Sequence, residues 1–108
     1  MYPDLSGKAV IVTGSSKGIG AAIALRFAQE GASVVVNYNA DQKGADAVVA
    51  QIQAADGKAV AIQGDMSREE SADALVQAAL DAFGRLDIFV NNAGMESPAH
   101  THEMTLAN

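Results

Sequence analysis

Cysteine and tryptophan are both absent from this chain of 108 residues, and only 5% of its residues are aromatic. Without cysteine the chain can form no disulfide, offer no thiolate nucleophile and build no cysteine-ligated metal site. Basic residues are also scarce, because seven lysines and arginines stand against thirteen acids, giving a net charge of −6. That balance argues against a basic surface for nucleic acid or for an anionic membrane. We therefore expect partners other than nucleic acid or membrane.

Long apolar runs are missing as well. No run approaches the roughly 18 apolar residues that a membrane span requires, and residues 1–5 show neither the basic nor the apolar part of a secretion signal. From these absences we expect a cytoplasmic protein. The apolar fraction of 49% suits a single packed domain over residues 1–108.

Neither proline nor glycine interrupts the β-rich runs, which alternate with helical patterns. Ile19, Ile23 and Phe27 recur at four-residue spacing, which predicts one packed helix face. Ser67 and Glu70 have the spacing of a capping box. This β-α-β-α-β-α-β order predicts an α/β fold with parallel strands in the order 3-2-1-4, joined by right-handed crossovers. The predicted strands are 8–13, 33–38, 58–63 and 87–90, and the predicted helices are 18–30, 41–55 and 67–83.

A glycine-rich turn, TGSSKGIG at residues 13–20, lies between the first predicted strand and helix. Glycine lets the backbone turn sharply and approach a ligand closely, and a helix start offers unpaired N–H groups and partial positive charge to an anion. The segment therefore predicts binding of a dinucleotide pyrophosphate; a glycine-rich turn without a ligand is the alternative. The phosphate loop of NTPases does not fit, because Lys17 is followed by Gly18 instead of serine or threonine.

Together with Asn91-Asn92-Ala93-Gly94, this turn resembles the short-chain dehydrogenase/reductase family, over nearly the whole chain from residue 5 onward. The resemblance implies the N-terminal half of a Rossmann-type, doubly wound parallel sheet. It also implies an NAD(P)-dependent oxidoreductase that transfers hydride between the cofactor and an alcohol or sugar. Residues 1–5, 37–38, 92–98 and 102–104 look more narrowly like bacterial glucose 1-dehydrogenases, which makes glucose the best single substrate guess.

By position, the resemblance implies a set of cofactor contacts. Asp65 would accept a hydrogen bond from the adenine amino group, Met66 would offer its backbone N–H, and Thr13 would brace the turn toward Asn92. The alternative for Asp65 is a turn carboxylate, and for Asn92 it is plain turn chemistry after a strand. The candidate cofactor-binding residues are Gly14, Ser15, Ser16, Lys17, Gly18, Ile19, Gly20, Asn37, Asp65, Met66, Asn92, Ala93 and Gly94.

The second predicted strand bears on the choice of cofactor. NAD-preferring sites usually place a carboxylate near its end, but here the sequence reads Asn37-Tyr38-Asn39, which is neutral. Lys17 offers a point charge to a 2′-phosphate, unless it is an ordinary solvated surface lysine. We therefore predict that NADP is accepted, with NAD as the open alternative.

No catalytic residue can be assigned. The family uses a serine and a tyrosine with a lysine four positions later, whereas Tyr2 is followed by Ser6 and Tyr38 by Gln42. Those residues normally come well after the Asn-Asn-Ala-Gly segment, so we expect a truncated chain that is inactive alone. We further expect the fourth strand to be an open edge, apolar strand surface to be exposed, and the isolated chain to fold poorly or self-associate. A homo-oligomer is expected for the full-length protein; a non-catalytic dinucleotide-binding module or subunit, or a remnant without cofactor affinity, is the alternative.

The C-terminal stretch carries two further expectations. Glu96, His100, His102 and Glu103 match no strong metal motif, so we expect no metal site. Thr101 or Thr105 is expected to cap the start of a further helix.

Overall fold

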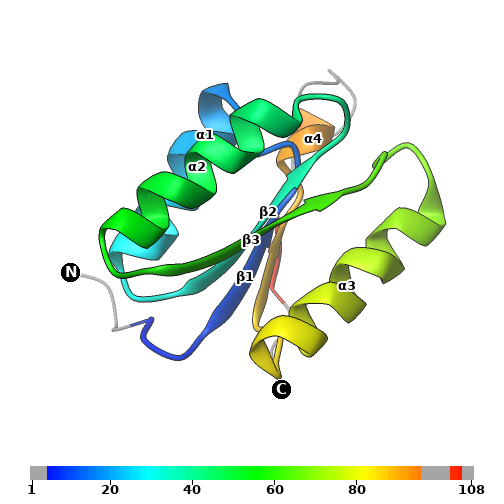
Figure 1. The fold of residues 1–108 in the computed structure, drawn as a ribbon. Helices are drawn as coiled ribbons and strands as arrows, with labels where there is room; N and C mark the ends of the chain where they lie inside the picture. The colour runs from blue at the N-terminus through cyan, green and yellow to red at the C-terminus, as the bar shows by residue number, and fades with distance from the viewer. Residues whose placement is uncertain (1–4, 96–102, 106–108) are drawn as a thin grey trace.

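The computed structural model describes residues 5–95 and 103–105. Strands and helices alternate along most of the chain, as the sequence predicts (Figure 1). All predicted helices and strands are present, with ends that differ from the prediction by at most two residues. The elements are β1 (Ala9–Val12), α1 (Gly18–Gln29), β2 (Ser33–Tyr38), α2 (Gln42–Ala54), β3 (Lys58–Gln63), α3 (Glu69–Phe83), β4 (Ile88–Val90), α4 (Asn92–Met95) and β5 (Glu103–Thr105).

The sheet has the order β3-β2-β1-β4-β5. Strands β1 to β4 are parallel in the predicted order 3-2-1-4. The prediction of an open edge at the fourth strand is wrong, because β5 pairs antiparallel with β4 and places Glu103 opposite Val90. Thr105 is the last residue of β5, and Thr101 and the residues of the helix expected after Thr105 lie outside the described residues.

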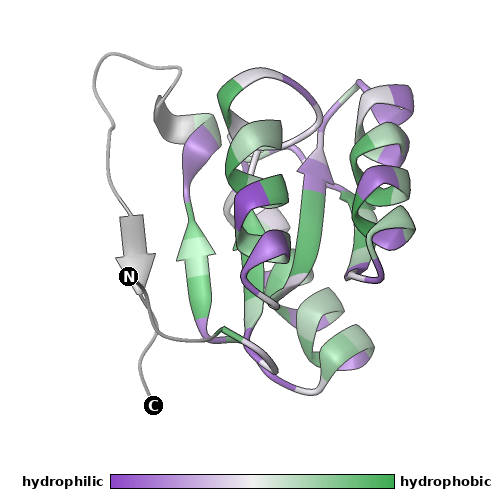
Figure 2. Cartoon of the chain, turned by 90° about the vertical axis from the view of Figure 1, so that its left-hand side faces the viewer, coloured by the Kyte–Doolittle hydropathy of each residue, from purple (hydrophilic) through white to green (hydrophobic). Residues whose placement is uncertain are grey.

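The helices cover the two faces of the sheet unequally (Figure 1). Val10 and Val12 of β1 pack on the side of α1 and α2, whereas Ile11 packs on the side of α3. This alternation follows from the two-residue repeat of side chains along a strand. Figure 2 shows strands that are mostly apolar and helices in which polar and apolar residues alternate. The sheet is therefore doubly wound, as predicted.

Exposure of large apolar side chains differs from the expectation. Among the described residues only Ile19 and Leu80 are exposed, and neither belongs to a strand. In the strands Val60, Ile62 and Ile88 are partly exposed, so the exposed apolar surface of β1 to β4 is smaller than expected. The predicted face of α1 is also wrong at its first member, since Ile23 and Phe27 pack against the core but Ile19 is 68% exposed. No described helix combines the length and apolar character that crossing a bilayer requires.

The start of α3 does not use the predicted capping box. The helix begins at Glu69, and Arg68 in the N-cap position makes no side-chain cap bond. The Ser67 hydroxyl instead donates to Oδ1 of Asp65 at 2.7 Å. The backbone N–H of Ser67, which a capping box would offer to Glu70, donates instead to the same Asp65 oxygen at 2.9 Å.

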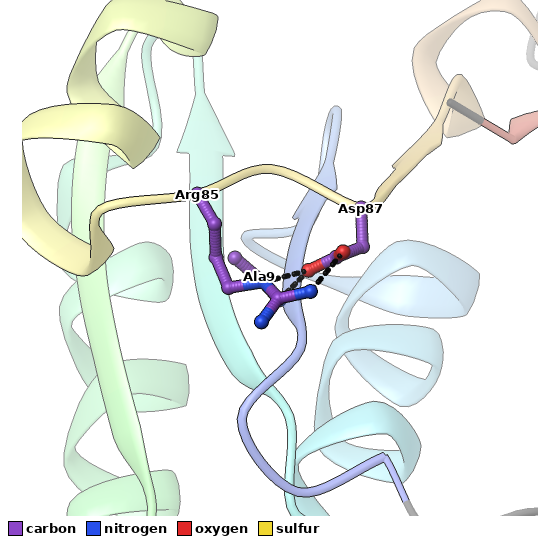
Figure 3. Close-up of polar contacts among 3 residues, drawn as sticks. All are labelled: Ala9, Arg85 and Asp87. Carbon is purple, nitrogen blue, oxygen red and sulfur yellow. Dashed lines mark hydrogen bonds and ion pairs between the residues drawn. The ribbon is translucent and has the colours of Figure 1, made fainter. Parts of the chain in front are cut away.

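An ion pair fixes β4 against β1 at the amino ends of the strands (Figure 3). Oδ2 of Asp87 accepts the backbone N–H of Ala9 at 2.8 Å. Nε and Nη2 of Arg85 donate to the two oxygens of the same carboxylate, each at 2.7 Å. The bonds from Arg85 hold the pKa of Asp87 below its ordinary value, with a smaller contribution from Ala9, although burial opposes them. The fold therefore favours the ionised form of Asp87, and this carboxylate links the starts of β1 and β4.

Candidate functional site

The two sequence motifs meet at the carboxyl ends of neighbouring strands. Thr13 follows β1 and Asn92 follows β4, and these strands pair directly. The backbone N–H of Ala93 donates to Oγ1 of Thr13 at 2.9 Å. Nδ2 of Asn92 donates to the carbonyl of Gly14 at 3.1 Å. Thr13 thus braces the glycine-rich turn against the segment of Asn92, and two distant stretches of sequence become one surface.

Glycine is required in the turn for two separate reasons. Gly18 has a φ of +63° with open space where a side chain would begin, so its backbone conformation alone favours glycine. Gly20 is limited by space, because a Cβ there would fall on the carbonyl oxygen of Gly14 and on Nδ2 of Asn92. The second limit shows that helix α1 packs tightly onto the bond between the two motifs.

The amino end of α1 is left without a side-chain cap. Lys17 holds the N-cap position without a cap bond, and the first turn of the helix contains no acidic residue. Helix α2 differs, because Oδ1 of Asp41 accepts the N–H of Gly44 at 3.0 Å. Uncapped helix N–H groups and the positive end of the helix dipole favour an anion. The turn and the start of α1 therefore fit a bound pyrophosphate group.

Asn37 lies beneath this turn, at the carboxyl end of β2, with 1% of its surface exposed. Its Oδ1 accepts the backbone N–H of Gly14 at 2.9 Å. Its Nδ2 donates toward the carbonyls of Gly64 at 3.2 Å and Ile62 at 3.3 Å. These bonds use both ends of the amide, which argues against direct contact between this side chain and a cofactor. They also explain why the residue is an uncharged amide, because this position needs both an acceptor and a donor.

Ser15 has a similar supporting position. It is fully buried, and its hydroxyl donates to the carbonyl of Val12 at 2.6 Å while accepting the backbone N–H of Asn37 at 3.0 Å. Ser16 is half-buried, and Lys17 is exposed. The sequence contained no pattern that distinguished these inward side chains from the outward ones, since the whole segment reads as a polar turn.

Asp65 lies in the loop after β3 and is half-buried. Its Oδ1 accepts both the hydroxyl of Ser67 at 2.7 Å and the backbone N–H of Ser67 at 2.9 Å. The hydroxyl bond first, and then the backbone bond, lower the pKa of Asp65. The carboxylate is therefore ionised at neutral pH and only accepts hydrogen bonds. Asp65 thus acts as a turn carboxylate in the structure. Its contact with the adenine amino group stays a prediction.

The remaining candidate residues follow β3 and β4. Met66 follows Asp65, and its side chain packs against the core on the α3 side. Gly94 lies in the short helix α4, which the sequence did not predict. Glu96, His100 and His102 lie outside the described residues, within which no cluster of metal-ligating side chains is found.

Comparison with known proteins gives a family match. The model of a family described as "short chain dehydrogenase" matches residues 8–108. Among curated relatives, 3beta-hydroxysteroid dehydrogenase 1 of Eggerthella lenta is 56% identical over 89% of this chain and 37% of its own length. Glucose 1-dehydrogenase 2 of Bacillus subtilis is 53% identical over 98% of this chain and 42% of its own length. The chain thus spans about two-fifths of the length of these relatives.

Solved structures show the same fold. A dehydrogenase/reductase from Sinorhizobium meliloti superimposes with a TM-score of 0.79 at 46% identity, covering 82% of this chain and 35% of that protein. A short chain dehydrogenase from Burkholderia cenocepacia, solved in complex with NADP, gives a TM-score of 0.78 at 46% identity. It is matched over 82% of this chain and 36% of its own length.

Proposed function

This chain belongs to the short-chain dehydrogenase family, and we propose that it forms the dinucleotide-binding part of an oxidoreductase acting on an alcohol or a sugar. The strongest support is the pair of hydrogen bonds that join the glycine-rich turn to Asn92 and Ala93. These bonds lie directly beside the start of α1, which has no side-chain cap. The nicotinamide, when bound, supplies the hydride chemistry, and the protein holds and orients it.

The proposed cofactor contacts all lie at the carboxyl ends of the parallel strands. Backbone groups from Gly14 to Gly20 hold the pyrophosphate at the start of α1. Asp65 accepts from the adenine amino group through Oδ2, which receives no hydrogen bond from the described residues. Met66 supplies a backbone N–H to the adenine ring, while Asn92, Ala93 and Gly94 line the adenosine ribose. No catalytic group is proposed within this chain, because the tyrosine–lysine pair that the family uses has no match in it.

NADP is the cofactor that we propose the site accepts. Tyr38 and Asn39 are neutral, Lys17 is exposed beside the turn, and the carboxylate of Asp41 is occupied as the N-cap of α2. Tyr38 and Asn39 therefore place no carboxylate at the end of β2, and the carboxylate of Asp41 is directed to the start of α2. Calorimetric titration of the complete protein with NADPH and with NADH tests this. NADH binding about tenfold tighter than NADPH, or roughly 1.4 kcal/mol, would refute it.

Glucose is the substrate that we propose, with oxidation at the anomeric carbon to a lactone. The support is the narrower sequence resemblance and the Bacillus subtilis relative named as a glucose 1-dehydrogenase. The relative named as a 3beta-hydroxysteroid dehydrogenase is equally similar, so the decisive assay compares the two substrate classes. We expect the complete protein to reduce its coenzyme with glucose. Turnover of a 3β-hydroxysteroid without any turnover of glucose would contradict the proposal.

The same assay tests the alternative of a non-catalytic module. A complete protein that binds coenzyme tightly but turns over no alcohol, sugar or steroid would support the module. The cytoplasmic location and the homo-oligomeric state expected from the sequence remain proposals of the same kind.

A further inference from the structure

Asn37 joins two parts of the proposed site that come from different strands. The glycine-rich turn follows β1, and the loop of Gly64 and Asp65 follows β3; β2, which ends at Tyr38, lies between them. Gly14 on one side donates to Asn37, and Gly64 on the other side accepts from it. The backbone of this strand end adds to the link, because Ser15 N–H donates to the Asn37 carbonyl at 2.8 Å and Gly64 N–H to that of Tyr38 at 2.8 Å.

The chemistry of the partners fixes which atom of the amide faces which side. The N–H of Gly14 can only donate, so it must face the amide oxygen, whereas the carbonyls of Ile62 and Gly64 can only accept, so they must face Nδ2. A primary amide is the side-chain group that carries an acceptor and a donor at this separation. A carboxylate of the same shape would turn an unprotonated oxygen toward two carbonyl oxygens.

We propose that Asn37 is a positioning residue that sets the separation between the pyrophosphate turn and the adenine loop, and so selects for an intact dinucleotide. This inference depends on the function proposed above. A ligand that spans both subsites requires the two loops to be held at one distance. A ligand that occupies one subsite alone does not require that distance. Asn37 therefore contributes to coenzyme affinity without touching the coenzyme.

The first test uses Asn37→Asp in the complete protein. Burial and the facing carbonyls will raise the pKa of the new carboxyl. Its protonated form can again donate to Gly64 and accept from Gly14, so it mimics the amide. We expect NADPH affinity about tenfold below that of the unmodified protein at about pH 8, recovering toward it as the pH falls to about 5.

The other ionisable groups near Asn37 do not explain such a recovery. All its hydrogen-bond partners are backbone groups or the Ser15 hydroxyl. Asp65, next to Gly64, has a pKa already lowered by Ser67, and Asp41 caps α2. The affinity is compared with that of the unmodified protein at each pH, so titration of the ligand cancels.

A matched control changes an amide to a carboxylate elsewhere. Gln53 is exposed on α2, and its Nε2 donates to the carbonyl of Ala59 at 3.4 Å, away from the carboxyl ends of the strands. Gln53→Glu makes the same chemical change without touching either loop. We expect its NADPH affinity to follow that of the unmodified protein at every pH.

The second variant, Asn37→Ser, removes the link without adding charge, because a serine side chain is too short to reach from Gly14 to Gly64. Titrations with NADPH, with ADP and with adenosine, followed by NMR, separate the subsites. We expect NADPH and ADP to weaken by about tenfold while adenosine binding is unchanged. A purely structural role would weaken all three ligands in the same proportion.

Two results would overturn the proposal. One is an Asn37→Ser protein in which adenosine weakens as much as ADP. The other is an Asn37→Asp protein whose affinity relative to the unmodified protein does not change with pH. If the unmodified protein binds neither NADPH nor NADH, the proposed function itself fails, and this inference falls with it.

Discussion

At the scale of single residues, three polar side chains hold the ends of the strands in place. Thr13 joins β1 to the segment after β4, and Asn37 joins the turn to β3. Asp87 joins β4 to β1 at the opposite ends of the strands. Each is largely buried and each satisfies a backbone group of another segment, so its loss would leave a polar group unpaired at a cost of about 1–3 kcal/mol.

The change Gly20→Ala tests the close approach in the turn. The added methyl would overlap the carbonyl of Gly14 and the amide of Asn92, so we expect a loss of about 1–3 kcal/mol in unfolding free energy and weaker coenzyme binding. Chemical denaturation and calorimetry measure the two effects. Asp46→Ala, at an exposed position of α2, is the control, because it touches neither the glycine-rich turn nor the segment of Asn92. Equal behaviour of the two variants would contradict the packing argument.

The change Asp87→Asn tests the ion pair at the amino ends of the strands. We expect a loss of about 1–2 kcal/mol at neutral pH, since a charge-assisted bond to Arg85 is removed. The pKa of Asp87 is lowered in the fold. Its stabilisation is therefore present above the unfolded value of about 3.9 and is lost as the pH falls through the lower folded value.

Denaturation curves from neutral pH down into the acid range measure this dependence. The variant should lose less stability than the unmodified protein over the acid range. Asp46→Asn, at an exposed position of α2, serves as the control and should follow the unmodified protein. An Asp87→Asn protein with the same acid sensitivity as the unmodified one would contradict the prediction.

At the scale of elements, the amino ends of α1 and α2 differ in their capping. Helix α2 is closed by Asp41 within its own chain, whereas α1 has no side-chain cap and no acid in its first turn. At α2 the N–H of Gly44 is already taken by Asp41, whereas no side chain caps the corresponding end of α1. This difference explains why the ligand is expected at α1.

The change Asp41→Ala removes the cap of α2. We expect a loss of about 1 kcal/mol in unfolding free energy, and the test is chemical denaturation. Asp46→Ala removes an acid from the middle of the same helix and should cost nothing measurable. A loss of similar size in both variants would show that charge, and not capping, is responsible.

At the scale of the whole molecule, the described residues form a compact unit. The Cα radius of gyration is 12.5 Å, close to the roughly 13 Å expected for a folded domain of this length. The strands are covered by the chain's own helices on both faces. The prediction that the isolated chain folds poorly or self-associates remains untested.

A polypeptide of these 108 residues separates coenzyme binding from chemistry. We expect the folded fraction of this polypeptide to bind NADPH at the glycine-rich turn and to catalyse no hydride transfer, because the family's serine, tyrosine and lysine have no match in it. Changes of the amide signals of Gly14 and Gly18 on titration measure the binding, and coenzyme absorbance measures turnover. Turnover above that of a Gly20→Ala control would contradict the statement that no catalytic group lies within this chain.

The sequence by itself determined the element order, the parallel strand order and the place of the glycine-rich turn. These depend on local patterns, such as the apolar runs 34–36 and 88–90 and the glycines at 14, 18 and 20, whose conformational preferences act over a few residues. Only the tertiary structure decided that Asn37 and Ser15 point inward, that Ile19 is exposed, and that β5 covers β4. The reason is physical: the direction of a polar side chain at a strand end depends on which distant backbone groups need a partner. Those groups, in Gly14, Gly64 and Ala93, come together only when the sheet has formed.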